Sequence, residues 1–427
     1  MRPIIKDLNG AKLFYIQTDR FKSEYFSLRF TVPLCTEHAQ KNALLMAVLG
    51  RGTRSYPTKL ALNRRLDTLY STSVSSRNHR LGDMQSIGFS ADFLGARYVN
   101  ESGGILSEVL DVLSELWYHP LLQDGIFCEE YVKSEKNNLC DAIRAAINNP
   151  RGYAMAKCRK LLCPGEPFAL SLIGEEESVA TMTGDNLFER HQALVKGAVP
   201  TFVYVGNTPI EELIAMLQAH FDLSVKTDTP FSAIVKRGEG APIMGQEEMP
   251  LAQGKLALGF RTDAVLGHPL APAMLVLNEI YGGSPASKLF LNVREQRSLC
   301  YHCSSAVDLY KGVLFANAGM KSENRTVTEE AMLEEFRAIE QGRITVTEFE
   351  AAKCALDHSY RQVFDNPVAL ADFYAGRALI GNTDTVDDFR RSVAQVTVDD
   401  VVAAAQHIHH GATFFLNGTL EGEEVEE

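Results

Sequence analysis

The chain of 427 residues contains one short pattern with an obvious chemical use, the C-x-x-C formed by Cys300 and Cys303. Two thiolates at this spacing can bind a metal or form a redox pair. Here the pattern falls in a predicted strand, where residues three apart point to opposite faces, so the sulfurs should not converge. No second C-x-x-C occurs, and eight cysteines are few for the length, as in a reducing compartment. The pattern therefore predicts neither a metal site nor a redox site.

A second stretch is notable for the chemistry that it lacks. It reads KNALLMAVLGRGTRSYPTK over residues 41–59, and no side chain from Ala43 to Leu49 is polar. The apolar run followed by Gly50 predicts a short buried helix that ends at the glycine.

The frame around this helix is typical of the zinc motif H-x-x-E-H. There, two histidines at i and i+4 bind the metal and the glutamate activates water. The motif usually follows a strand and a short loop and continues into GT and a basic residue. In this chain Ala43, Met46 and Ala47 stand where His, Glu and His would be. Alanine has no lone pair and a thioether is a poor zinc ligand, so no zinc site is expected here.

With this frame the chain resembles the pitrilysin/insulinase family of zinc peptidases, which includes the subunits of mitochondrial processing peptidase. The similarity continues through GRGTRSYPTKLALNRRLDTLYSTSVSSRN and covers essentially the whole chain. The segment FCEEYVKSEKNNLCDAIRAAINNPRGYA resembles the helix that brings the family's third zinc ligand, a glutamate. Aligned on Glu135, that ligand position falls at Ala142. The resemblance thus implies a zinc site that is vacant at Ala43, Met46, Ala47 and Ala142.

The second half resembles the family's C-terminal signature in GGSPASKLFLNVREQRSLCYHCSS, residues 282–305. The signature's arginine and tyrosine are Arg294 and Tyr301, at the same separation of seven. The resemblance implies that they reach a facing zinc centre, where they hold the substrate backbone and the tetrahedral intermediate. By residue type alone, a helix arginine is more often a solvated charge and a strand tyrosine a half-buried packing residue.

The elements that would position these residues recur along the chain. TFVYVGNT at 201–208 returns as TFFLNGT at 413–419, and LNRRLDTLYSTSVSS from Leu62 aligns with LNVREQRSLCYHCSS from Leu291. The order and the similar offsets predict a duplication. We therefore expect an N-terminal domain over 1–222, a linker over 223–250 rich in proline, glycine and charge, and a C-terminal domain over 251–427.

Each half passes from strand-like alternation to longer amphipathic patterns. We expect helices over 104–118, 125–146, 327–341 and 347–363, and helix starts at Thr183 and at Thr397, the second with a capping box. Strands that follow one another directly favour an antiparallel sheet with helices packed mainly on one face. The expected fold class is α+β, with two homologous domains of the insulinase and processing-peptidase type.

Composition excludes several functions and favours one compartment. The net charge is −12 and no basic stripe is present, which argues against nucleic acid. No run approaches 18 apolar residues and the N-terminus has no apolar signal core, so we expect neither a membrane span nor secretion. We expect a cytoplasmic protein.

The resemblance favours one function and leaves an alternative open. Family members with one intact half-site usually work in pairs in which one chain carries zinc. This chain is similar to the zinc-less member of the paired insulinase-like proteins of Gram-positive bacteria. It would bind no cofactor itself and would contribute Arg294 and Tyr301 to a zinc-bearing paralogue that cleaves peptides. The alternative is a structural or peptide-binding homodimer with no part in proteolysis. An autonomous hydrolase that uses other residues has no support.

Overall fold

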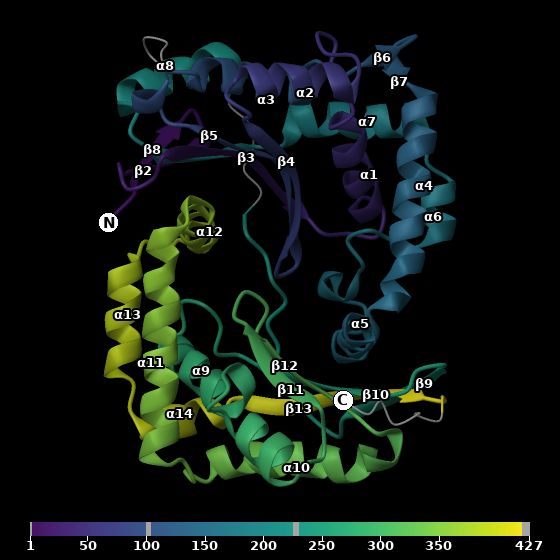
Figure 1. Ribbon diagram of the computed structural model, residues 1–427, viewed down its shortest axis with the longest axis vertical. Helices are drawn as coiled ribbons and strands as arrows, with labels where there is room; N and C mark the ends of the chain where they lie inside the picture. The colour runs from purple at the N-terminus through teal and green to yellow at the C-terminus, as the bar shows by residue number, and fades with distance from the viewer. Residues whose placement is uncertain (1, 100–103, 225–229, 421–427) are drawn as a thin grey trace. The chain divides into compact units, whose positions relative to one another are not determined.

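Two mixed β-sheets organise the chain in the computed structural model, which describes residues 2–99, 104–224 and 230–420 (Figure 1). Each sheet belongs to one of two compact units. The first unit comprises the described residues of Met1–Arg144, Leu170–Ser232 and Val363–Thr385. The second comprises those of Ala145–Ala169, Ala233–Gln362 and Val386–Glu427. Both units are therefore discontinuous in sequence.

The sheet of the first unit has six strands in the order β1-β2-β8-β3-β5-β4. β2 and β8 run parallel, and every other neighbouring pair is antiparallel. Alternate residues of β3, among them Phe26, Leu28 and Phe30, lie in the apolar core. The strands are β1 (Ile4–Leu8), β2 (Ala11–Gln17), β3 (Ser23–Pro33), β4 (Ser73–Leu81), β5 (Met84–Leu94) and β8 (Pro200–Gly206).

Most helices of this unit contribute side chains to the same apolar core. They are α1 (Ala39–Leu49), α2 (Lys59–Thr68), α3 (Leu106–Tyr118), α4 (Glu129–Ala145), α6 (Glu176–Ala180), α7 (Gly184–Gly197) and α8 (Ile210–His220); a small hairpin, β6 (Leu122–Gln123) and β7 (Ile126–Phe127), precedes α4. The sheet face opposite this core packs against α12 (Pro367–Ala378) (Figure 1). There Asp372 of α12 lies 2.8 Å from Arg29 and 2.9 Å from Arg77, both buried on the sheet.

The sheet of the second unit has five strands in the order β11-β12-β10-β13-β9. Its one parallel pair joins β13 and β9. The strands are β9 (Ile243–Met249), β10 (Gly254–Thr262), β11 (His302–Asp308), β12 (Val313–Met320) and β13 (Ile408–Gly418). Without β1, the sheet of the first unit has the same number of strands and the same pattern of parallel and antiparallel neighbours, as a duplication would produce.

Helices cover both faces of the second sheet as well. The helices are α5 (Pro150–Leu162), α9 (Ala271–Asn278), α10 (Arg325–Glu340), α11 (Val346–Gln362), α13 (Val386–Gln395) and α14 (Val398–Ala405). α5 comes from the first half of the sequence, and Ala154, Cys158 and Leu162 pack on this sheet against Ala257 and Phe414. On the other face, Phe260 of β10 contacts Tyr281 and Phe336. Figure 1 shows α5 and α10 on opposite sides of the strands.

The α+β fold class is confirmed, with one difference in the sheets. We expected antiparallel sheets, whereas each sheet contains a parallel pair and is mixed. The reason is that β8 and β13 reach their sheets after long helical connections, which can return a strand in either direction. The four expected long helices are found as α3, α4, α10 and α11. Capping boxes start α7 at Thr183 and α14 at Thr397, because each threonine and the third helical residue bond each other's backbone.

The stretch expected to be a linker includes a strand. Residues 243–249 form β9, whose sequence IMGQEEM places its apolar residues at the two ends and so lacks the apolar–polar alternation of a half-buried strand. Residues 225–229 of this stretch lie outside the described residues. The domain boundaries at 222 and 251 remain a prediction about homology, whereas the compact units follow the contacts that α5 and α12 make. In the part of the chain that the structure describes, no helix is long and apolar enough to cross a membrane.

Candidate functional site

The motif positions that we expected to be vacant lie on α1, in the first unit. Ala43 and Met46 are buried and Ala47 is half-buried. The helix is held by Asn42, whose Nδ2 donates to Gln85 of β5 at 2.7 Å and whose Oδ1 accepts from Arg190 of α7 at 2.8 Å. The side chains at the three motif positions offer no metal ligand of the usual kinds.

A pocket of about 280 Å³ adjoins this part of α1 within the first unit. Its apolar wall consists of Met46, Ala47, Leu62, Leu66, Val74, Phe89 and Leu116. Its polar lining consists of Arg51, Lys59, Asn63, Ser76 and Glu135. No group of three or more His, Cys, Asp or Glu side chains that could hold a metal ion occurs in residues 2–99, 104–224 and 230–420.

The carboxylate in this pocket is that of Glu135, and it already has polar partners. Its Oε1 lies 3.1 Å from Nη1 of Arg51, which directly follows the C-terminal glycine of α1. Its Oε2 accepts from Asn138 at 3.0 Å. The Arg51 guanidinium also stacks over the Tyr131 ring, 4.9 Å from its centroid. This ion pair could not be predicted from the sequence, because its partners are 84 residues apart.

Ala142, the position aligned with the third zinc ligand, is exposed on α4 and does not line the pocket. It lies two helical turns beyond Glu135 on the same helix. The polar group that α4 contributes beside Met46 and Ala47 is therefore Glu135.

The other two candidates lie in the second unit. Arg294 is on η5 (Leu289–Gln296), a π-helical segment, and this rare conformation often occurs at functional sites. Its side chain is 37% exposed, lies 3.4 Å from Glu295 and stacks over Phe290 at 4.6 Å. Tyr301 is 50% exposed, and its backbone N–H donates to Gly319 of β12 at 2.8 Å, which fixes the chain just before β11.

The fold brings Arg294 close to the residues on either side of Tyr301. The pKa of the Cys300 thiol is lowered, first by its interaction with Cys303 and also by the positive charge of Arg294, against the opposing effect of burial. The pKa of His302 is lowered by burial, then by the charges of Lys255, Arg151 and Arg294. Arg294 and the Tyr301 turn therefore belong to one small region, which we call the Arg294/Tyr301 half-site.

The interaction between the two thiols corrects one expectation. We expected Cys300 and Cys303 to point to opposite faces of a strand, but each affects the pKa of the other. The reason is that β11 begins only at His302 and the chain bends at Tyr301, so strand alternation does not apply to Cys300. Cys303 also donates from Sγ to the carbonyl of Leu289 at 3.0 Å, which joins the start of η5 to β11.

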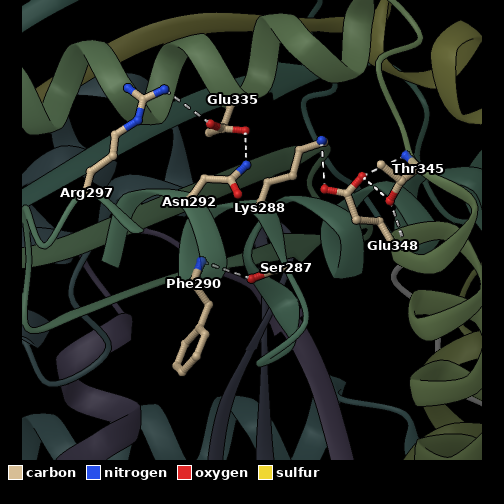
Figure 2. Close-up of polar contacts among 8 residues, drawn as sticks. All are labelled: Ser287, Lys288, Phe290, Asn292, Arg297, Glu335, Thr345 and Glu348. Carbon is tan, nitrogen blue, oxygen red and sulfur yellow. Dashed lines mark hydrogen bonds and ion pairs between the residues drawn. The ribbon is translucent and has the colours of Figure 1, made fainter. Parts of the chain in front are cut away.

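Polar contacts anchor η5 from the side away from Phe290 (Figure 2). Lys288 Nζ lies 2.8 Å from Glu348 of α11, and the lysine is buried while the glutamate is 13% exposed. Glu348 also accepts from the backbone and hydroxyl of Thr345, at the start of the same helix. Burial alone would raise the pKa of Glu348, but the hydrogen bond and charge of Lys288 and the Thr345 hydrogen bonds leave that pKa lowered.

Two further contacts tie η5 to α10. Asn292 donates to Glu335 at 2.8 Å, and Arg297 lies 3.7 Å from the same carboxylate (Figure 2). Arg297 also pairs with Glu334 at 2.9 Å. The segment that carries Arg294 is thus fastened to two helices, while Arg294 itself stays partly exposed. Lys288 and Asn292 lie within the quoted signature, but their partners Glu348 and Glu335 are distant in the sequence and could not be predicted from it.

The chain is similar to known proteins of the peptidase M16 type. A protein-family profile described as "Peptidase M16 inactive domain" matches residues 181–356. The chain is 28% identical to the "Probable inactive metalloprotease YmfF" of Bacillus subtilis, over 96% of each chain. It is also 23% identical to the "Uncharacterized zinc protease YmxG" of the same bacterium, over 70% of this chain and 72% of that protein.

Solved structures share the fold over almost the full length. A conserved protein from Enterococcus faecalis superposes with a TM-score of 0.90 at 26% identity, covering 99% of this chain and 100% of that one. A structure described as a peptidase M16 inactive domain from Pseudomonas fluorescens has a TM-score of 0.78 at 19% identity, with coverage of 99% and 100%. The second likeness concerns the fold alone.

Proposed function

The chain belongs to the peptidase M16 (insulinase) family as an inactive member, and from this premise we propose that it is the non-catalytic subunit of a heterodimeric metallopeptidase. In this proposal a zinc-bearing paralogue performs the hydrolysis. This chain contributes the Arg294/Tyr301 half-site, which binds the peptide backbone. The relative described as a zinc protease shows the kind of chain that could carry the metal.

The observation that carries the proposal is the combination of exposure and anchoring at Arg294. A purely structural arginine is expected to be buried or paired with acids from other elements, but among the described residues Arg294 forms its ion pair with its neighbour Glu295, and its guanidinium stacks on the Phe290 ring. The pairs Lys288–Glu348 and Asn292–Glu335 hold the segment beneath it. A guanidinium on a fixed support, with donors left over, suits the binding of carbonyl oxygens and of a developing oxyanion.

The chemistry assigned to each side chain follows from its functional groups. The guanidinium of Arg294 would donate hydrogen bonds to the peptide carbonyl that is being attacked, and its charge would stabilise the negative oxygen. The Tyr301 hydroxyl would donate a further hydrogen bond to the backbone of the peptide. The free edge of a sheet can hold such a peptide by strand addition, since β11 pairs only with β12 among the described strands.

Reconstitution tests this proposal. The chain is co-expressed with an M16 relative from the same genome that has H-x-x-E-H, and the purified complex is assayed on quenched fluorescent peptides. Loss of an oxyanion donor typically costs a hundredfold or more in kcat, so Arg294→Ala should lower the rate about a hundredfold. Arg343→Ala, an exposed arginine elsewhere in the unit, serves as the matched control. A complex whose Arg294→Ala rate equals that of the control would disprove the proposed role.

A second candidate is a peptide-binding homodimer that takes no part in proteolysis. The engaged Arg51–Glu135 pair and the apolar α1 favour it, because both suit a site that has been refilled as packing. Sedimentation analysis of the pure chain and of the mixture distinguishes the two. A stable homodimer that ignores every zinc-bearing relative would favour the second candidate.

A further inference from the structure

The pocket beside α1 has a pronounced division between an apolar interior and a basic rim. Met46, Leu62, Leu66, Phe89 and Leu116 are buried and form its wall. The volume of about 280 Å³ is close to the lower end of small-ligand pockets, roughly 300–1,000 Å³. The pocket therefore has room for one apolar side chain.

The charges on the rim are not balanced. The single acid, Glu135, is already paired with Arg51 and Asn138 and is not available to a basic ligand. Lys59 is exposed at the first position of α2 and makes no ion pair with any residue that the structure describes. Asn63, one helical turn further along, and Ser76 on β4 add neutral hydrogen-bond donors. The rim thus offers one unpaired positive charge and two polar groups.

A free strand edge borders this rim. β4 is the last strand of its sheet, and among the described strands it pairs only with β5. Val74 and Ser76 are two residues apart, lie on the same face of β4 and both line the pocket. An extended chain added along this edge would therefore run past the pocket.

From this arrangement we propose that the pocket binds the carboxyl terminus of a peptide whose last residue is apolar. The last side chain occupies the apolar interior, and the terminal carboxylate lies at Lys59, with Asn63 and Ser76 donating hydrogen bonds. Charge complementarity selects this occupant, because an amide in the same place would leave Lys59 without an anion. The inference rests on the proposed function in so far as it assumes that the chain binds peptides, and it adds which end is recognised.

Paired peptides test the inference with the full-length chain alone. Two N-terminally labelled peptides of one extended sequence ending in leucine, one with a free carboxylate and one amidated, are titrated by fluorescence anisotropy. The free acid should bind about tenfold more tightly, as expected for one charge-assisted contact at a partly exposed site. Added salt should reduce the difference, since Lys59 is exposed.

Single substitutions show which residues cause the preference for the free acid. Lys59→Ala should remove the preference for the free acid and leave binding of the amide unchanged, whereas Lys133→Ala, an exposed lysine of α4 that does not line the pocket, should leave the preference intact. Ala47→Leu, which fills the pocket from α1, should weaken both peptides. Unfolding of each variant, followed by fluorescence, shows whether the fold is retained.

Each outcome has a definite meaning. Equal binding of acid and amide overturns the inference but leaves peptide binding, and with it the proposed function, in place. A preference for the acid that survives Lys59→Ala also overturns it, because the carboxylate would then bind elsewhere. If neither peptide binds while the reconstituted complex is active and depends on Arg294, the pocket inference fails alone. If that complex is also inactive, the pocket inference and the proposed function both fail.

Discussion

Arg51 Nη1 lies 3.1 Å from Glu135 Oε1 and so joins the end of α1 to α4 within the first unit. The arginine follows the helix that carries Ala43, Met46 and Ala47, and the glutamate belongs to the helix that was aligned with the third ligand. The lining of the adjoining pocket thus includes one ion pair, whose two residues are far apart in the sequence.

Glu135→Gln should lower the free energy of unfolding of the first unit by about 1 kcal/mol, because the pair is partly exposed and such pairs contribute modestly. Urea unfolding followed by fluorescence of Trp117, the single tryptophan, measures this. Trp117 is buried against Phe30 in the first unit and reports its unfolding. Glu130→Gln, an exposed acid in the first turn of α4, should change the stability by less than about 0.5 kcal/mol. Equal losses in the two variants would mean that the pair contributes nothing specific.

Met46→Ala should destabilise the first unit by about 2 kcal/mol, since a buried methionine is replaced by a smaller side chain beside an existing pocket. The same Trp117 measurement applies. Leu60→Ala, at a position 61% exposed on α2, is the control and should have little effect. A variant as stable as wild type would show that α1 does not depend on its apolar side chains at the vacant positions.

Glu166→Gln should destabilise the second unit by about 3 kcal/mol. The carboxylate lies 2.8 Å from Arg261 and 2.7 Å from Lys311, and all three side chains are almost fully buried. The substitution leaves the buried cations Arg261 and Lys311 without the carboxylate that they share, and this lowers the free energy of unfolding. Urea unfolding followed by circular dichroism gives the change in the free energy of unfolding. Glu175→Gln, which removes an acid from the first unit instead, is the comparison. A loss below about 1 kcal/mol would contradict the expectation.

The same carboxylate predicts a dependence on pH. Burial would raise the pKa of Glu166, but the hydrogen bonds of Arg261, Lys311 and Lys236 outweigh it and lower that pKa from 4.5 to about 2. A carboxyl group with a lower pKa in the folded state stabilises that state above its unfolded pKa and loses this contribution as the pH falls through the folded value. The stability difference between wild type and Glu166→Gln should be constant above about pH 5 and shrink between about pH 4.5 and 2. A difference that does not change with pH would contradict the lowered pKa.

Glu348→Gln should loosen the segment that carries Arg294. Lys288 would stay buried without the carboxylate of Glu348. We therefore expect the free energy of unfolding of the second unit to fall by about 2 kcal/mol. Hydrogen exchange should become faster in residues 289–296 and stay unchanged in α1. Glu350→Gln, an exposed acid on α11, should alter neither. Unchanged protection of 289–296 would show that Lys288 and Glu348 do not hold η5.

Much of the fold could be predicted because its signals are local. The apolar run that ends at Gly50 predicted α1, and the threonines at 183 and 397 predicted two helix starts, since capping needs only residues three apart. The C-x-x-C reasoning failed because strand alternation was applied to Cys300, which precedes the strand. Because β11 begins two residues after Cys300, the two thiols need not point to opposite faces of a strand.

By itself the sequence determined the α+β class, the long helices and the identity of the side chains at Ala43, Met46, Ala47, Arg294 and Tyr301, because periodicity, capping and residue type act over a few positions. Only the tertiary structure decided that α5 packs on the second sheet and α12 on the first, and that Glu135 meets Arg51 while Lys288 meets Glu348. An amphipathic pattern shows that a helix has an apolar face but not which sheet will cover it. Charges far apart in the chain become partners only when packing brings them together and removes water from around them.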